Sequence, residues 1–175
     1  MSSYQINHYD LIICDLVQLY RPKTIIEFGV LEGYSLGAIL GAAPVSAKVI
    51  AYDIFEEFPG HHANKTEMER RFSGIIQYGD FYKVHEKLED SSIDMFHIDI
   101  ANTGDTYEFF LQNYLRKLSS GGIALLEGGS SERDDYEWMK KYNKPKIRPV
   151  VTRLMKAGFE CFTFEPFPSM TIIKG

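Results

Sequence analysis

The stretch TIIEFGVLEGYSLGAIL, residues 24–40, decides the predicted fold. Its apolar, β-branched start at 24–26 predicts a buried strand, and residues 34–40 are compatible with a helix. Between them lies a turn with two glycines, which tolerate positive φ and let a ligand approach the backbone. The first turn of the following helix presents unpaired N–H groups. The stretch therefore predicts a strand, a ligand-binding turn and a helix.

The residues of this turn indicate the kind of ligand. A dinucleotide-binding turn reads G-x-G-x-x-G, whereas this one reads E-x-G-x-x-x-G-x-S, with Glu27 where the first glycine would stand. A carboxylate there repels phosphate and attracts an ammonium or sulfonium group. A second predicted strand, 48–52, ends at Asp53. An acid in that place accepts hydrogen bonds from both hydroxyls of a ribose.

On these residues the sequence resembles the class I S-adenosylmethionine-dependent methyltransferases, most closely their small O-methyltransferase-like members, from about residue 24 to 175. The resemblance implies an α/β fold: a Rossmann-like, doubly wound sheet of seven strands, five parallel plus a C-terminal antiparallel hairpin, flanked by helices. The length predicts a single domain over 1–175, with an N-terminal helix in 1–22 and a Rossmann-like core in 23–175.

The resemblance also assigns a set of residues to the cofactor S-adenosyl-L-methionine, at the ends of the predicted strands. The methionine end is assigned to Glu27, Gly29, Gly33 and Ser35, the ribose to Asp53, and the adenine to Asp80 with Phe81, while Ile54 and Asp99 complete the set. Two alternatives stay open. Ser35 is equally well explained as a helix cap, and Gly79-Asp80 is also an ordinary turn.

The catalytic candidates follow two later strands. Asp99 ends the fourth predicted strand, which lies beside the first in a doubly wound sheet, where ligands bind. The family often has a histidine three residues later, but this sequence has Asn102, which argues against a histidine base. His97 is interpreted as a core residue. Glu127 ends the fifth predicted strand, and Asp99, Glu127 and Asn102 are the predicted catalytic residues.

Metal binding is an open alternative at Asp99 and Glu127, because metal-dependent members of the family use acids after the fourth and fifth strands. Two carboxylates supply only a few of the oxygen ligands that magnesium or calcium requires, so a divalent cation is not favoured and no metal ligand is assigned. The pair His61-His62 is interpreted as part of a solvated loop. The acidic, serine-rich segment 127–135 has a second interpretation, a solvated turn with helix-capping serines.

Composition limits the partners and the location. The net charge is −5 with no long basic run, which disfavours nucleic acid, and 45% hydrophobic and 14% aromatic residues exclude a disordered chain. Cys14 and Cys161 are predicted to be core thiols rather than a disulfide. No signal peptide or membrane-length apolar stretch is recognisable, so the prediction is a cytoplasmic protein without membrane contact. A homodimer is left open.

The predicted function is S-adenosylmethionine-dependent transfer of a methyl group to a small-molecule acceptor, at a hydroxyl oxygen. Two alternatives are kept. One is an S-adenosylmethionine-binding protein without transferase activity, which the short N-terminus and the missing histidine favour. The other is a nucleotide- or NAD-dependent enzyme of similar architecture, which Glu27 and the predicted terminal hairpin disfavour.

Overall fold

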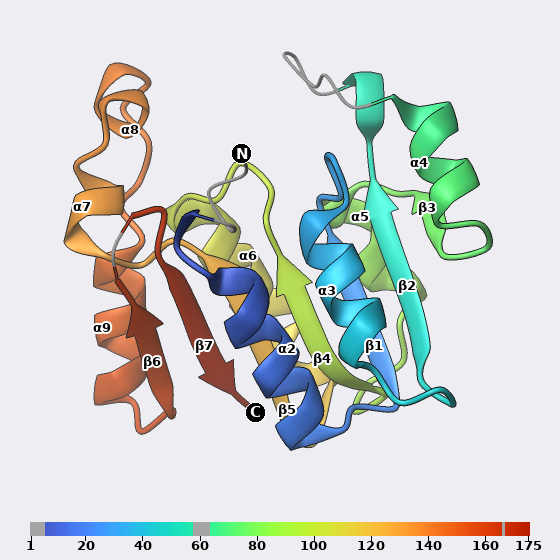
Figure 1. The fold of residues 1–175 in the computed structure, drawn as a ribbon. Helices are drawn as coiled ribbons and strands as arrows, with labels where there is room; N and C mark the ends of the chain where they lie inside the picture. The colour runs from blue at the N-terminus through green and yellow to red at the C-terminus, as the bar shows by residue number, and fades with distance from the viewer. Residues whose placement is uncertain (1–5, 58–63, 166) are drawn as a thin grey trace. The chain divides into compact units, whose positions relative to one another are not determined.

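A computed structural model of the chain describes residues 6–57, 64–165 and 167–175 (Figure 1). The chain divides into two compact units, 1–88 and 89–175, which are treated one at a time. His61 and His62 lie outside the described residues, so their interpretation as a solvated loop stays a prediction.

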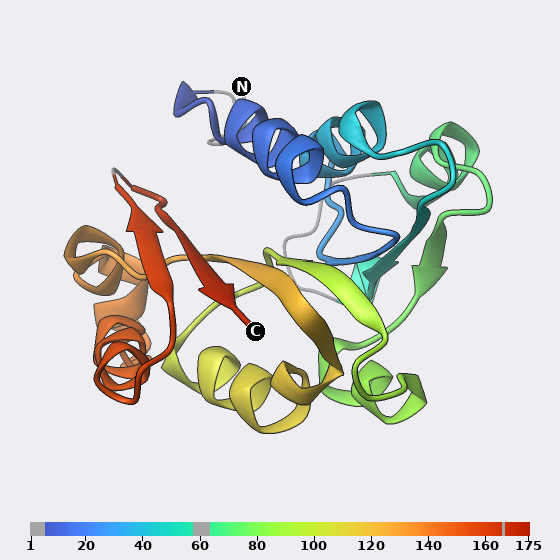
Figure 2. The ribbon, with the colours of Figure 1, turned by 90° about the horizontal axis from the view of Figure 1, so that it is seen from below.

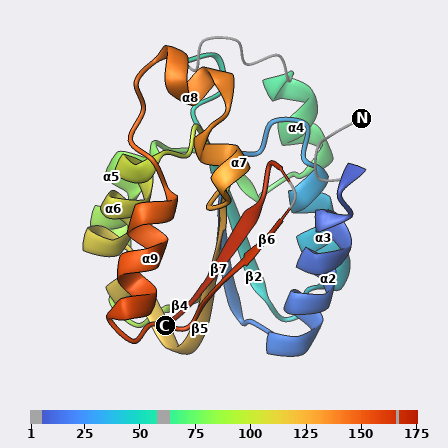
Figure 3. The ribbon, with the colours of Figure 1, turned by 90° about the vertical axis from the view of Figure 1, so that its left-hand side faces the viewer.

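The first unit is built on three parallel strands. Its elements in chain order are α2 (Tyr9–Tyr20), β1 (Thr24–Phe28), α3 (Tyr34–Ala42), β2 (Lys48–Asp53), the 3-10 turn η1 (Phe55–Glu57), α4 (Lys65–Arg71), β3 (Ile76–Tyr78), α5 (Phe81–Val84) and η2 (His85–Lys87). The strand order is β3-β2-β1. Helices α2 and α3 lie on one face of these strands and α5 on the other (Figure 3).

Apolar residues at the sheet explain this packing. A cluster of buried side chains from the glycine turn, α3, β2 and α4 forms one core, and its members are Val30, Leu36, Ala51, Met68 and Phe72. Helix α2 lies within the predicted range 1–22 and ends before Pro22, with Arg21 left-handed at φ 47° and its N–H bonded to the Val17 carbonyl at 2.9 Å. The sequence stretch 24–40 therefore forms the predicted strand, turn and helix.

The second unit contains the other four strands. Its elements are β4 (Ile93–Ile98), α6 (Gly104–Asn113), η3 (Leu115–Lys117), β5 (Leu118–Glu127), α7 (Ser131–Asp134), α8 (Glu137–Lys141), α9 (Arg148–Lys156), β6 (Cys161–Phe164) and β7 (Met170–Lys174). β4 and β5 are parallel, β7 runs antiparallel to β5, and β6 pairs antiparallel with β7. Helices α6 and α9 cover the same face of these strands (Figures 2 and 3).

The described chain thus has seven strands, five in parallel pairs and two in a C-terminal antiparallel hairpin, with flanking helices. The predicted Rossmann-like fold class is confirmed. The assignment of the whole chain to a single domain stays a prediction.

Three details refine or correct the sequence analysis. Strand β5, which ends at Glu127 as predicted, begins as early as Leu118, because Leu118 already pairs with Ile93 ahead of an irregularity in the ladder. His97 is 0% exposed in β4, as expected of a core residue. Gly37 and Gly41, which follow Gly33 at helical spacing on α3, do not mark close helix–sheet packing, since a Cβ at Gly41 would meet no atom within 4 Å and one at Gly37 only the end of the Arg71 side chain.

The two cysteines are both free and half-buried. Cys14 on α2 donates a weak hydrogen bond to the Ala38 carbonyl at 3.5 Å, and burial raises the pKa of both thiols. Neither thiol is in a setting that would activate it as a nucleophile.

Candidate functional site

The glycine turn after β1 adopts a backbone that other residues rarely adopt. Gly29 has φ 88° and Gly33 has φ 72°, and Gly33 is the N-cap of α3. A Cβ built on Gly33 would collide with the ring of Phe72. The Phe72 ring therefore packs against the backbone where a side chain at residue 33 would stand, and the turn leads directly into the N-terminus of α3, where N–H groups lack partners within the helix.

Glu27 and Ser35 form a buried polar pair behind this turn. Glu27, on β1, is 0% exposed, and the Ser35 hydroxyl donates to its Oε1 at 2.5 Å. The helix-cap alternative for Ser35 is wrong, because α3 has no side-chain cap and its N-cap position belongs to Gly33. The sequence motif therefore brings a carboxylate and a hydroxyl together beside the glycine backbone.

Asp53, the last residue of β2, holds the same turn from the next strand. Its Oδ2 accepts the N–H groups of Val30 at 2.7 Å and Leu31 at 3.3 Å, and its Oδ1 accepts that of Phe55 at 2.7 Å. These three bonds fix the orientation of the carboxylate at the carboxyl end of β2. Ile54 follows it and is half-buried.

The predicted adenine residues lie at the end of β3 and the start of α5. Asp80 is the N-cap of α5, where its carboxylate accepts the Tyr82 N–H at 2.9 Å, and it is half-buried. Phe81 is 3% exposed and packs edge-on against Phe28, with ring centroids 5.2 Å apart. Asp80 thus keeps an open side toward solvent, whereas Phe81 is used mainly as a core residue.

In the second unit, the two predicted acids follow the paired strands β4 and β5. Asp99 comes directly after β4 and is half-buried, and Glu127 ends β5 and is 6% exposed. Burial, followed by the negative charge of Asp99, raises the pKa of Glu127 to about 8, and the neighbouring Arg133 acts in the opposite direction. The two acids are therefore electrostatically coupled, as their places at the ends of neighbouring parallel strands predict.

Arg133 is a functional candidate that the sequence analysis missed. It lies in α7, its N–H bonds to the N-cap Ser130 at 3.0 Å, and its guanidinium contacts both carboxylate oxygens of Glu127, at 2.7 and 3.3 Å. Ser130, Arg133 and Asp134 are all buried, so the interpretation of 127–135 as a solvated turn is wrong, although a serine does cap the helix. The signal in the sequence was a lone cation within an acidic run, six residues after Glu127.

Asn102 connects the ends of β4 and β5. It is 0% exposed, and its amide nitrogen donates to the carbonyls of Ile98 and Glu127, both at 2.9 Å. Its amide oxygen accepts the Ile100 N–H at 3.3 Å, and its own carbonyl accepts from Arg133 at 3.0 Å. With its amide engaged by the backbone in this way, Asn102 is suited to positioning the acids rather than to contacting a substrate.

The glycines after Glu127 are held by side chains from distant elements. The Tyr107 hydroxyl lies within hydrogen-bond reach of the carbonyls of Leu126, Glu127 and Gly128, and Thr171 donates to the Gly128 carbonyl at 2.8 Å. Burial raises the pKa of Tyr107 well above its ordinary value, so it stays a neutral donor. The loop that carries Arg133 is thus anchored by α6 and β7.

Within 6–57, 64–165 and 167–175, no cluster of three or more His, Cys, Asp or Glu side chains is arranged to hold a metal ion. In the same part of the chain, no helix has both the length and the apolar character needed to span a bilayer.

Comparison with known proteins adds to this geometry. Residues 26–127, more than half of the chain, match the sequence profile of the family described as "Methyltransferase domain". No curated protein sequence gives a significant match. A solved structure from Staphylococcus aureus, provisionally assigned as a caffeoyl-CoA O-methyltransferase, superposes with a TM-score of 0.72 at 19% identity and covers 98% of this chain and 88% of its own.

Two further solved structures are similar. The O-methyltransferase TomG of Streptomyces achromogenes, in complex with SAM, gives a TM-score of 0.67 at 17% identity, covering 99% of this chain and 80% of that one. An O-methyltransferase of Bacillus cereus in complex with SAH gives 0.65 at 16% identity, covering 100% and 82%. These likenesses establish the shared fold, and the profile match over the glycine turn, β2, β4 and β5 shows that the chain belongs to the methyltransferase-domain family.

Proposed function

We propose that this protein is an S-adenosylmethionine-dependent methyltransferase that methylates an oxygen of a small-molecule acceptor. The observation that carries the proposal is the turn of the first unit, in which Gly29 and Gly33 leave bare backbone between the Glu27–Ser35 pair and the Asp53 carboxylate. Its membership of the methyltransferase-domain family supports the same activity. When bound, S-adenosylmethionine supplies an electrophilic methyl group on a sulfonium centre.

The residues of the first unit fit this cofactor group by group. Glu27 places a negative charge beside the turn, which favours the cationic methionine end, and Ser35 fixes the orientation of that carboxylate. Asp53, which three backbone N–H groups hold in one orientation at the end of β2, is proposed to accept hydrogen bonds from the ribose hydroxyls. Asp80 and Phe81, with Ile54 beside Asp53, are proposed to surround the adenine and ribose.

In the second unit, we assign the proton chemistry to Asp99. Both oxygens of Glu127 are engaged by Arg133, so Asp99 is the better placed of the two acids to accept a proton from an acceptor hydroxyl. Glu127 and Asn102 then hold the ends of β4 and β5 in register for Asp99, which remains a candidate for cofactor contact as well. The main contribution to rate in such a transfer is the positioning of the reacting atoms.

The acceptor, the partners and the location belong to the same proposal. We propose a small-molecule acceptor, and the net charge of −5 disfavours a nucleic-acid partner. We further propose a cytoplasmic location, in keeping with two cysteines that are both free thiols. The oligomeric state is open to measurement by light scattering.

The test is isothermal titration of the wild type with S-adenosylmethionine and S-adenosylhomocysteine, with NADH and ATP as comparison ligands. We expect micromolar binding of the first two only. Asp53→Asn keeps the size of the side chain and should weaken both affinities at least tenfold. The matched control is Asp15→Asn, which removes the same charge from an exposed position on α2.

Two outcomes would count against the proposal. Binding of NADH or ATP, without binding of either methionine compound, would replace it with a nucleotide-dependent enzyme of similar fold. Micromolar S-adenosylmethionine binding without methyl transfer to any of a panel of phenols, catechols and aliphatic alcohols would favour a binding protein without transferase activity.

A further inference from the structure

The carboxylate of Glu127 already has a cation beside it. Arg133 donates from Nε to Oε1 at 2.7 Å and from Nη2 to Oε2 at 3.3 Å, in the two-pronged geometry that a guanidinium offers a carboxylate. Nη2 also donates to the Asn102 carbonyl at 3.0 Å. Both charged side chains are only 8% exposed, so water screens the pair weakly.

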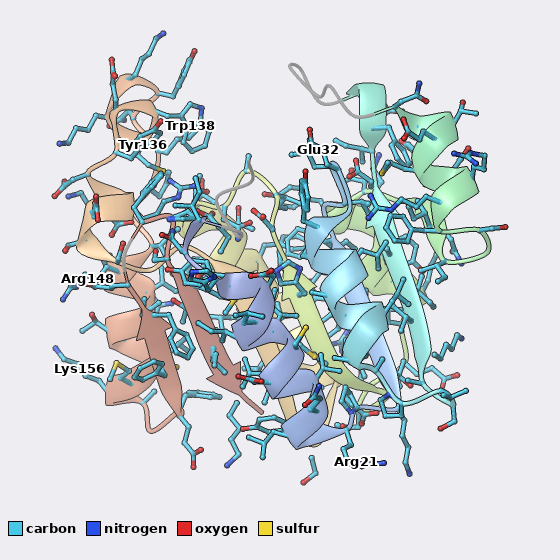
Figure 4. The ribbon with its side chains drawn as sticks, in the orientation of Figure 1. Arg21, Glu32, Tyr136, Trp138, Arg148 and Lys156 are labelled. Atoms are coloured by element: carbon cyan, nitrogen blue, oxygen red, sulfur yellow. The ribbon has the colours of Figure 1, made fainter. Side chains whose placement is uncertain are left out.

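The surroundings hold the guanidinium in this place. The ring of Trp138, from α8, lies 5.6 Å from the guanidinium carbon, within the range of a cation–π contact, and Figure 4 shows Trp138 on the segment that follows α7. The Arg133 backbone is fixed by the Ser130 cap. Ser130 therefore holds the main chain of Arg133, Glu127 holds its guanidinium, and the guanidinium lies over the Trp138 ring.

A divalent cation at Asp99 and Glu127 does not fit this arrangement. Such an ion would need the same Glu127 lone pairs that receive the Arg133 N–H groups, and it would place a second positive charge against the guanidinium. The oxygens that accept hydrogen bonds from the guanidinium, those of the Glu127 carboxylate and the Asn102 carbonyl, are nevertheless hard donors of the kind that magnesium or manganese prefers. The negative charge of Asp99 also acts on Glu127.

We propose that Arg133 is a built-in cation that takes the place of a divalent metal at Asp99 and Glu127, and that it positions the Glu127 carboxylate in a metal-independent reaction. The part that concerns the reaction rests on the proposed function. The part that concerns the cation does not, because it follows from the contacts within the second unit. As a consequence, a variant that lacks the guanidinium but keeps both acids should bind a divalent metal ion at Asp99 and Glu127.

The experiment is a titration with Mn²⁺ at pH 8, where Glu127 of the wild type, with its pKa of about 8, is ionised in about half of the molecules. It is followed by electron paramagnetic resonance, in which bound Mn²⁺ loses the signal of the free ion. Arg133→Met should gain one Mn²⁺ site at least ten times tighter than any site that wild type has, and the double variant Arg133→Met/Glu127→Gln should lose it. Arg133→Lys keeps a positive charge and should gain no such site. The matched control is Arg153→Met, which breaks the exposed pair with Glu108 on the surface.

Three results would overturn the proposal. The first is a folded Arg133→Met that gains no Mn²⁺ site, and the second is an equal gain in Arg133→Lys. The third needs no arginine variant: wild type that binds one Mn²⁺ below 1 mM, with the site lost in Glu127→Gln, would show that a metal and Arg133 share the carboxylate. The Mn²⁺ result does not depend on S-adenosylmethionine binding, so failure of the cofactor titration and failure of this proposal are distinguishable.

Discussion

Replacing Asn102 by alanine tests whether this residue holds the second unit together at the ends of β4 and β5. In Asn102→Ala, the buried carbonyls of Ile98 and Glu127 each lose a donor at 2.9 Å, and the Ile100 N–H loses a longer bond. A lost buried hydrogen bond costs about 1–1.5 kcal/mol, and more where its partner is left unsatisfied. Because the Tyr107 hydroxyl can still reach the Glu127 carbonyl, the expected loss is about 2–3 kcal/mol.

The assay is equilibrium unfolding in urea, followed by the fluorescence of the single tryptophan, Trp138, and by circular dichroism. The tryptophan reports on the second unit, and agreement of the two signals tests whether unfolding is two-state. For a chain of this size the expected loss lowers the melting temperature by roughly 4–12 °C. The control is Asn113→Ala on α6, where a half-buried amide makes one bond to the Phe109 carbonyl and alanine is the better helix former.

A change of less than about 0.5 kcal/mol in Asn102→Ala, or one equal to that of Asn113→Ala, would refute the positioning role. If stability were unchanged while methyl transfer was lost, Asn102 would act in the chemistry itself, and the assignment of its amide to the backbone would be wrong.

Two further predictions concern the glycine turn and the buried acid. Gly33→Ala should lower the free energy of unfolding by about 1–3 kcal/mol, because residue 33 has a φ of 72° and a Cβ there would meet the Phe72 ring. Gly41→Ala has open space around the new Cβ and should raise the free energy of unfolding by up to about 1 kcal/mol. Thermal melts in which Gly33→Ala is the more stable of the two would contradict this. For Glu127, the folded pKa of about 8 exceeds the ordinary 4.5, so the folded state holds a proton that the unfolded state has lost between those pH values. The free energy of unfolding should therefore fall as pH rises from about 4.5 to 8, by at most ~1.4 kcal/mol per pH unit. Glu127→Gln should flatten this slope, even though it leaves Arg133 without its carboxylate. If urea unfolding at a series of pH values gave the same slope for both proteins, the prediction would be contradicted.

Much of the fold was predictable because its signals are local. The apolar periodicity of 9–20 and the stop at Arg21-Pro22 set the bounds of α2, and the β-branched runs before Glu27 and Asp53 set β1 and β2. The glycine turn was recognisable because positive φ selects glycine within a few residues of a strand end. Each of these features depends on residues that are neighbours along the chain.

The acidic segment after β5 shows where local reasoning stopped. An acid- and serine-rich run predicts a solvent-exposed turn, and the cap that Ser130 provides agrees with that prediction. Its backbone is held by Tyr107, Ser169 and Thr171, which lie 21 to 43 residues away in sequence from the residues they bind. No periodicity within the segment carries that information.

By itself, the sequence determined the order of strands and helices, the glycine turn and the placement of an acid at the end of each of several strands, because these follow from backbone sterics and short-range hydrophobic spacing. Only the tertiary structure decided that Ser35 serves Glu27 rather than the helix end, that Asn102 joins β4 to β5, and that Arg133 lies at Glu127. The physical reason is that the parallel pairing of β4 with β5 brings the Asp99–Asn102 loop beside Glu127 and α7, and hydrogen bonds across that distance leave no pattern along the chain.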